Sequence, residues 1–138
     1  MPDREESFRH WFEGYLAAFN HADFAAFSAY YADDVIFAGQ AAQVVGRQSV
    51  VDFYRRVRRY LDERVELLTF VGAADRGKIV AELRTTLVAV RDWPDMPTGA
   101  MREGDTRTTV SFAIYELAGD RFARIRTARF ARFEGTAR

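Results

Sequence analysis

The stretch YLAAFNHADFAAFSAYYADD, from Tyr15 to Asp34, predicts two short helices joined by a turn. The first helix begins before this stretch and carries apolar side chains at helical spacing, namely Phe8, Trp11, Phe12, Tyr15, Leu16 and Phe19. Asp23 suits the N-cap of the second helix, because its side-chain oxygen can accept a hydrogen bond from an unpaired amide of the first turn. The second helix is expected to end at Asp33-Asp34 and to carry Phe24, Phe27, Tyr30 and Tyr31. Two helices with this much aromatic surface need a large concave surface to cover.

The remainder of the chain predicts one short strand, a third helix and then four strands. The short strand is Val35 to Phe37, a loop runs to Val45, and the third helix runs from Gly46 to about Leu61. The later strands are expected at residues 65–71, 78–91, 106–117 and 121–133, where apolar residues recur with a period of two. This order predicts an α+β fold, in which three N-terminal helices pack on one face of a curved antiparallel sheet. The helices and the bent sheet would enclose a cone-shaped cavity suited to a small molecule.

Composition excludes several functional classes. The chain has 138 residues, which is typical of a single domain over 1–138, and 20 basic residues balance 20 acidic ones, which argues against a nucleic-acid surface. It contains no cysteine and two histidines, so neither a metal site nor any cofactor is expected. No apolar run reaches transmembrane length and the N-terminus has no signal-like core, so we expect a soluble cytoplasmic protein without membrane contact.

Four motifs resemble those of a known superfamily. They are YLAAFNHADFAAF, YYADDVIF, GRQSVVDFY and the turn Gly119-Asp120-Arg121-Phe122, and together they span nearly the whole chain. Their order and spacing resemble the nuclear transport factor 2-like superfamily, which includes ketosteroid isomerases and SnoaL-type polyketide cyclases. The resemblance implies the cone-shaped fold (an α-β barrel) but not one function, because this scaffold hosts several enzyme classes and also non-enzymatic modules.

Three tyrosines match positions that carry chemistry in ketosteroid isomerases. Tyr15 corresponds to the oxyanion-hole tyrosine of that family, and Tyr31 and Tyr54 look like the tyrosines that support it in some members. In a chain of phenols each hydroxyl can donate to the next and so stabilise negative charge at the end. The alternative is that all three tyrosines belong to an aromatic core.

The acids of these families are missing. Gly39 occupies the position of the ketosteroid isomerase base, and Ala113 lies at or near that of its second oxyanion donor. The limonene epoxide hydrolase aspartate would fall at Thr86, and the SnoaL-type acid at Thr127. We therefore do not predict steroid isomerisation.

Other charged residues are candidates to supply the missing groups. Glu82 and Arg84 share one face of the expected strand 78–91, which points either into the cone or outward, where Glu82 would pair with Arg124 or Arg126. His21 is either a proton shuttle or an exposed turn residue. Arg129 is either an anion clamp facing the cavity or part of a salt bridge at its rim.

The sequence thus predicts a cofactor-independent isomerase, lyase, dehydratase or cyclase that acts on a small, largely apolar and possibly aromatic molecule. The predicted catalytic residues are Tyr15, Tyr31, Tyr54, Glu82, Arg84 and His21. The predicted substrate-binding residues are Trp11, Phe19, Phe37, Phe53, Trp93, Tyr115, Thr127 and Arg129. The alternative is a non-catalytic module for hydrophobic ligands or for dimerisation, and a homodimer through the outer face of the sheet is expected in either case.

Overall fold

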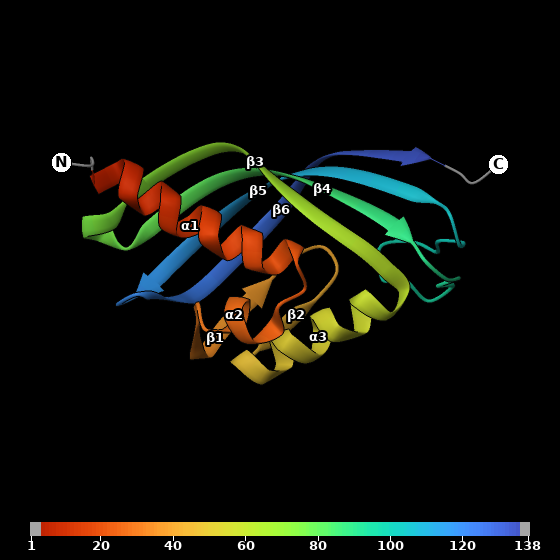
Figure 1. The fold of residues 1–138 in the computed structure, drawn as a ribbon, viewed down its shortest axis with the longest axis horizontal. Helices are drawn as coiled ribbons and strands as arrows, with labels where there is room; N and C mark the ends of the chain where they lie inside the picture. The colour runs from red at the N-terminus through yellow and green to blue at the C-terminus, as the bar shows by residue number, and fades with distance from the viewer. Residues whose placement is uncertain (1–3, 136–138) are drawn as a thin grey trace.

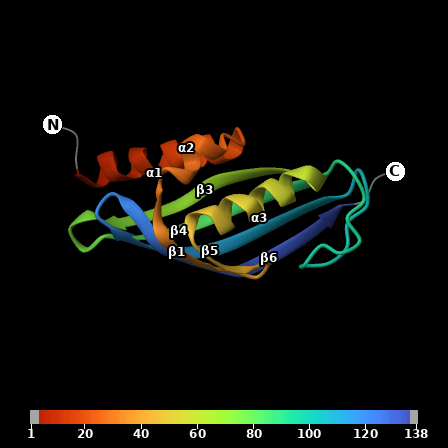
Figure 2. The same ribbon diagram turned by 90° about the horizontal axis from the view of Figure 1, so that it is seen from below.

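A mixed, curved sheet carries the three α-helices on one of its sides (Figures 1 and 2). The computed structural model describes residues 4–135. Its helices are α1 (Arg4–Asn20), α2 (Phe24–Ser28), α3 (Arg47–Tyr60) and the short 3-10 helix η1 (Ala74–Arg76). Its strands are β1 (Tyr31–Ala38), β2 (Gln43–Val45), β3 (Leu61–Ala73), β4 (Lys78–Ala89), β5 (Thr106–Ala118) and β6 (Arg121–Gly135).

The sheet contains the predicted four-strand meander, and β1 and β2 extend it at one edge. Strands β3, β4, β5 and β6 pair antiparallel in sequence order, as the period-two runs predicted. Strand β1 then pairs parallel to β6, and β2 pairs antiparallel to β1, so that the strand order is β2-β1-β6-β5-β4-β3. The sheet is therefore mixed and remains open between β2 and β3. The α+β fold class is confirmed.

The second helix is shorter than predicted. Asp23 caps it as expected, since Asp23 Oδ1 accepts from Ala26 N at 3.1 Å, but the helix ends at Ser28. Tyr31 begins β1, where it pairs with Phe122 and its carbonyl oxygen accepts two hydrogen bonds from the Arg47 guanidinium. The prediction that Tyr30 and Tyr31 continue the helix is wrong, because pairing with β6 takes this segment into the sheet.

Strand β3 begins four residues earlier than predicted. Helix α3 ends at Tyr60 and the chain enters β3 at Leu61, which is fully buried and pairs with Ala89. Side chains alternate across a strand, so Glu63 lies on the same face as Leu61 and Val65. This early start places a carboxyl group on the concave face of the sheet.

The core has two clusters of buried side chains. In the larger one, Phe12, Tyr15 and Phe19 of α1 pack on the sheet together with Tyr115 and Phe122. The smaller one lies at the C-terminal end of α3. It contains Val57, Leu61, Leu87, Ala89, Trp93 and Met101. Residues of both clusters line one cavity. Within residues 4–135, no helix combines the length and the apolar character that a membrane crossing requires.

Candidate active site

The cavity lies between the helices and the concave face of the sheet. Its volume is about 190 Å³, and cavities of about 150 Å³ bind benzene, so its size suits a body of one or two rings. Aromatic and aliphatic side chains from α1, α3 and β3 to β5 form most of the wall. Residues 4–135 contain no group of three His, Asp or Glu side chains placed to hold a metal ion.

Two of the three predicted tyrosines form a buried hydrogen-bonded pair. The hydroxyl oxygens of Tyr15 and Tyr31 are 2.7 Å apart, and Tyr15 lines the cavity whereas Tyr31 lies behind it. Burial raises the pKa of both phenols, so both keep their protons at neutral pH. When Tyr31 donates to Tyr15, the Tyr15 hydrogen is free to point into the cavity.

Tyr54 lines the cavity without joining this pair. Its ring contacts Phe19, Phe27 and Phe37, and among the described residues its hydroxyl has no hydrogen bond. The pKa of Tyr54 is raised mainly by burial, and to a smaller extent by the nearby Tyr15 and Glu63. The predicted chain of three phenols is therefore a pair, with a third phenol facing the same space.

Glu63 brings a carboxyl group into this aromatic cavity. It lines the cavity from β3, and its Oε1 atom is the one side-chain oxygen or nitrogen in residues 4–135 that is buried without a hydrogen-bond partner. Burial raises the pKa of Glu63 from 4.5 to about 7, although the Arg58 guanidinium acts in the opposite direction. Glu63 also raises the pKa of Tyr15, so the carboxyl and the phenol interact across the cavity. Near pH 7 this group can both take up and release a proton.

Burial of Glu63 should make the protein less stable at neutral pH. The folded protein binds the Glu63 proton more tightly than the unfolded chain does, so stability is lost as pH rises from about 4.5 to about 7. We expect Glu63→Gln to raise the free energy of unfolding by up to about 3 kcal/mol above pH 7 and by little near pH 4.5. Urea unfolding at pH 4.5, 6 and 8 measures this. An increase in the free energy of unfolding that is the same at all three pH values would contradict a raised pKa of Glu63.

Most of the predicted substrate-binding residues line the cavity. They are Phe19, Phe37, Phe53, Trp93, Tyr115, Thr127 and Arg129. Trp11 does not line it: it lies one turn before Tyr15 in α1, where its ring packs against Tyr30 and Phe122. The cavity and its aromatic lining are thus largely as the sequence indicated.

Three of the predicted catalytic residues lie elsewhere. Glu82 is on the outer face of β4, where its carboxylate accepts from Thr69 Oγ1 at 2.7 Å rather than pairing with Arg124 or Arg126. Arg84, on the same face, pairs with Glu66 at 3.6 Å, and the exposed His21 contacts the carbonyl oxygen of Ala17. The apolar residues of β4 take the inward face, which leaves Glu82 and Arg84 outside the cavity, and His21 lies in the exposed turn between α1 and α2. The prediction that these three residues act inside the cavity is therefore corrected, since none of them lines it.

Of the four positions that hold acids in the related families, two face the cavity, whereas Thr86 and Ala113 do not line it. Gly39 and Thr127 both line it, and a β-carbon at position 39 would lie 2.6 Å from Thr127 Oγ1, closer than van der Waals contact. A larger residue at position 39 therefore requires Thr127 to move. The carboxyl group of this cavity comes from β3 instead.

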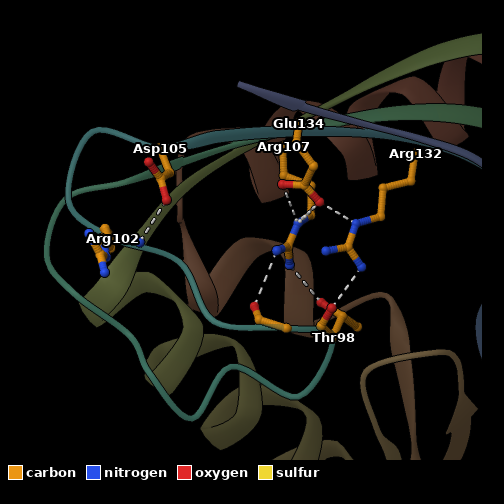
Figure 3. Close-up of polar contacts among 7 residues, drawn as sticks. Thr98, Arg102, Asp105, Arg107, Arg132 and Glu134 are labelled. Atoms are coloured by element: carbon orange, nitrogen blue, oxygen red, sulfur yellow. Dashed lines mark hydrogen bonds and ion pairs between the residues drawn. The ribbon is translucent and has the colours of Figure 1, made fainter. Parts of the chain in front are cut away.

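A buried arginine holds the loop between β4 and β5, which lines the cavity through Trp93, Met96, Pro97 and Thr98 (Figure 3). Arg107 is 3% exposed and donates from Nε to Glu134 at 2.9 Å, from Nη1 to Thr98 Oγ1 at 3.0 Å and from Nη2 to the carbonyl of Gly99 at 3.2 Å. Arg132 donates to the same carboxylate and to the carbonyl of Thr98. Partial burial tends to raise the pKa of Glu134, but hydrogen bonds from Arg132 and Arg107 hold it below its usual value.

Loss of this arginine should weaken the loop. Arg107→Met would leave the Gly99 carbonyl and the Thr98 hydroxyl without their donor, and we expect it to lower the free energy of unfolding by about 1–3 kcal/mol. Glu134 is half exposed and keeps its ion pair with Arg132, so its loss of Arg107 should add little to the destabilisation. Denaturant unfolding measures the change, with the exposed loop residue Arg91→Met as a control expected to be neutral. Equal stabilities of the two variants would contradict a structural role for Arg107.

The comparisons with known proteins agree with this fold. The sequence profile of the SnoaL-like domain family matches residues 12–125. No curated protein matches the sequence.

Solved structures with the same fold share little sequence with the chain. A candidate polyketide cyclase from Xanthomonas campestris pv. campestris is 19% identical, with a TM-score of 0.76 over 91% of this chain and 92% of that one. A second candidate polyketide cyclase, from Pseudomonas putida KT2440, is 23% identical, with a TM-score of 0.74 over 92% and 91%. An LEH-like epoxide hydrolase from M. tuberculosis is 14% identical, with a TM-score of 0.69 over 88% and 80%. At these identities the likeness concerns the fold alone.

Proposed function

Since this chain belongs to the SnoaL-like family, we propose that it is a cofactor-independent enzyme that moves a proton on a small, largely apolar substrate. Glu63 is the general base. Tyr15, supported by Tyr31, is the hydrogen-bond donor to the oxygen on which negative charge develops. The aromatic walls of the cavity hold the body of the substrate and exclude water.

The first chemical step follows from these roles. The Glu63 carboxylate takes a proton from the carbon next to a carbonyl group, and the electron pair of that C–H bond moves toward the carbonyl oxygen. The Tyr15 hydroxyl donates to the resulting enolate oxygen, and Tyr31 donates to Tyr15. Return of the proton to another carbon of a conjugated enolate isomerises the substrate. If the next carbon carries an oxygen, the enolate can instead break that C–O bond, and the leaving oxygen takes the proton, which completes an elimination. Attack of the enolate carbon on a second carbonyl carbon, whose oxygen then takes the proton, closes a ring.

The observation that carries this proposal is the Glu63 carboxyl. A buried polar group without a partner is costly, and native proteins keep few of them. Strongly shifted pKa values in a cleft are typical of acid–base catalysts, which work best when the pKa lies near the working pH.

Deuterium exchange tests the proposal before the natural substrate is known. A panel of small enolisable ketones would be incubated with the protein in D2O, and loss of the α-proton signal would be followed by NMR. We expect exchange with the wild type and with Glu82→Gln, whose carboxylate lies on the outer face, and none above background with Glu63→Gln. Exchange at the same rate in Glu63→Gln and the wild type would contradict the proposal.

A non-catalytic ligand-binding module is the second candidate. It is favoured by the absence of acids at Gly39, Ala113 and Thr127. A binder should keep its affinity for a hydrophobic ligand in Tyr15→Phe and show no exchange chemistry at all. The Glu63 carboxyl favours the enzyme, because a module that only binds apolar ligands has no use for it.

A homodimer through the outer face of the sheet is part of the proposal. Phe112, Phe130 and Phe133 lie on that face of β5 and β6 and are 46%, 70% and 62% exposed. A patch of this kind is a typical subunit interface. We expect Phe130→Asp to raise the dimer dissociation constant on the order of 100-fold, as measured by sedimentation velocity. Val45→Asp, on the edge strand β2, should have no effect. A monomeric wild type would contradict the dimer.

A further inference from the structure

Two arginines face the cavity and only one of them is neutralised. Among the described residues that line the cavity, Glu63 is the single acid, and Arg107 and Arg129 are the cations. The guanidinium of Arg107 forms an ion pair with Glu134 and donates to Thr98 and Gly99. Arg129 has no ion pair, and its side chain has no hydrogen bond, within residues 4–135. The free positive charge of the cavity is therefore that of Arg129.

Three residues that neighbour Arg129 carry hydrogen-bond donors. The backbone N–H of Arg129 donates to Gln40 Oε1 at 2.7 Å, and the amide nitrogen of Gln40 has no hydrogen bond among the described residues, so its two hydrogens are available. Ser111, the strand partner of Arg129, and Thr127, two residues before it, both line the cavity with their hydroxyl groups unbonded among the described residues. Arg129 is exposed, so this set of donors lies at the mouth of the cavity.

The two charges are separated both across the sheet and along its strands. Arg129 on β6 and Glu63 on β3 are three strand spacings apart, about 14 Å for a flat sheet. They are also about 13 Å apart along the strands, because Arg129 is in register with Leu83 of β4 and Glu63 with Leu87, four residues further on. An anionic group placed beside the Glu63 carboxylate would be repelled, whereas beside Arg129 it would be attracted. A negatively charged substrate thus has one favourable orientation.

We propose that the substrate is an organic acid, whose carboxylate is bound by Arg129 and the Gln40 amide at the mouth while its reacting carbon lies near Glu63 and Tyr15. The placement of the reacting carbon near Glu63 and Tyr15 rests on the proposed function, whereas the carboxylate site does not depend on it. A planar guanidinium matches a carboxylate with two parallel hydrogen bonds, and the single free charge of Arg129 balances the single charge of a carboxylate. Binding of the carboxylate at Arg129 would fix which carbon of the substrate lies next to Glu63.

A matched pair of probes tests the carboxylate site by binding alone. Dissociation constants of 2-naphthol and 6-hydroxy-2-naphthoate would be measured by fluorescence in low salt for the wild type, Arg129→Met and Arg126→Met. Arg126 is an exposed arginine of the same strand on the opposite face, so it controls for the loss of a charge. We expect the wild type and Arg126→Met to prefer the naphthoate on the order of 10- to 100-fold. We expect Arg129→Met to lose this preference and to bind 2-naphthol as the wild type does.

The outcomes separate this inference from the proposed function. No preference in the wild type, or equal weakening of both probes by Arg129→Met, would overturn the carboxylate site whatever Glu63 does. A preference that depends on Arg129, together with deuterium exchange that is unchanged in Glu63→Gln, would keep the carboxylate site and overturn the proposed base.

Discussion

Glu63→Gln is expected to lower turnover by about 100- to 10,000-fold, because glutamine keeps the shape of the side chain but cannot accept the substrate proton. Substrate binding should change little, since the amide remains polar and of the same size. The wild-type value of kcat/KM should rise with pH through a midpoint of about 7, the pKa to which burial raises Glu63. The base is active when ionised, so activity should be lost below this midpoint and level off above it.

Two controls make this result interpretable. Glu82→Gln removes a carboxylate from the adjacent strand on the outer face and should retain turnover. Glu63→Gln is also expected to be more stable than the wild type at neutral pH, so unfolding cannot explain a loss of activity. Turnover within a few fold of the wild type would show that Glu63 is not the base.

Tyr15→Phe is expected to lower kcat by about 100- to 1000-fold, the usual effect of removing one oxyanion donor. The ring packing of Tyr15 against Phe122 and Phe12 should survive the change, so KM should move much less than kcat. Tyr31→Phe should have a smaller effect, because Tyr31 is a positioning residue that reaches the substrate only through Tyr15. Steady-state kinetics of the two variants measure the difference.

Tyr30→Phe is the matched control for these variants. Tyr30 precedes Tyr31 and contacts the Tyr15 ring at 5.4 Å, but it does not line the cavity. It should keep nearly full turnover. Equal losses in Tyr15→Phe and Tyr30→Phe would mean that the phenols act through packing of the aromatic core and not through the Tyr15 hydroxyl.

The fold was predictable from the sequence where one periodicity persists. The apolar stripe of α1 and the alternation in β4, β5 and β6 are long, and Gly77 and Gly119 occupy the tight turns with positive φ. The parallel pairing of β1 with β6 was not predictable, because it depends on a contact between residues 31–38 and 122–126, far apart in the chain. For that reason Tyr31 was assigned to a helix although it begins a strand.

The candidate site was predictable only in part. Tyr15 and the aromatic lining follow from the stripe of α1 and the resemblance to known families. Glu63 was missed because α3 passes into β3 without a turn residue, so the polar run Asp62-Glu63-Arg64 looks like the exposed end of a helix. The available signal was the alternation of Leu61, Glu63, Val65 and Leu67, which continues the strand pattern backward from Val65.

Absorbance of a bound naphthol tests the central claim most directly, because its ionisation requires both a base and an oxyanion donor. At pH 7–8 we expect the wild type to bind 2-naphthol as the naphtholate, with its proton on Glu63 and its oxygen hydrogen-bonded to Tyr15. The naphtholate spectrum should persist in Glu82→Gln and disappear in Glu63→Gln and in Tyr15→Phe. Neutral naphthol in the wild type, or a naphtholate signal that survives in both cavity variants, would contradict the account.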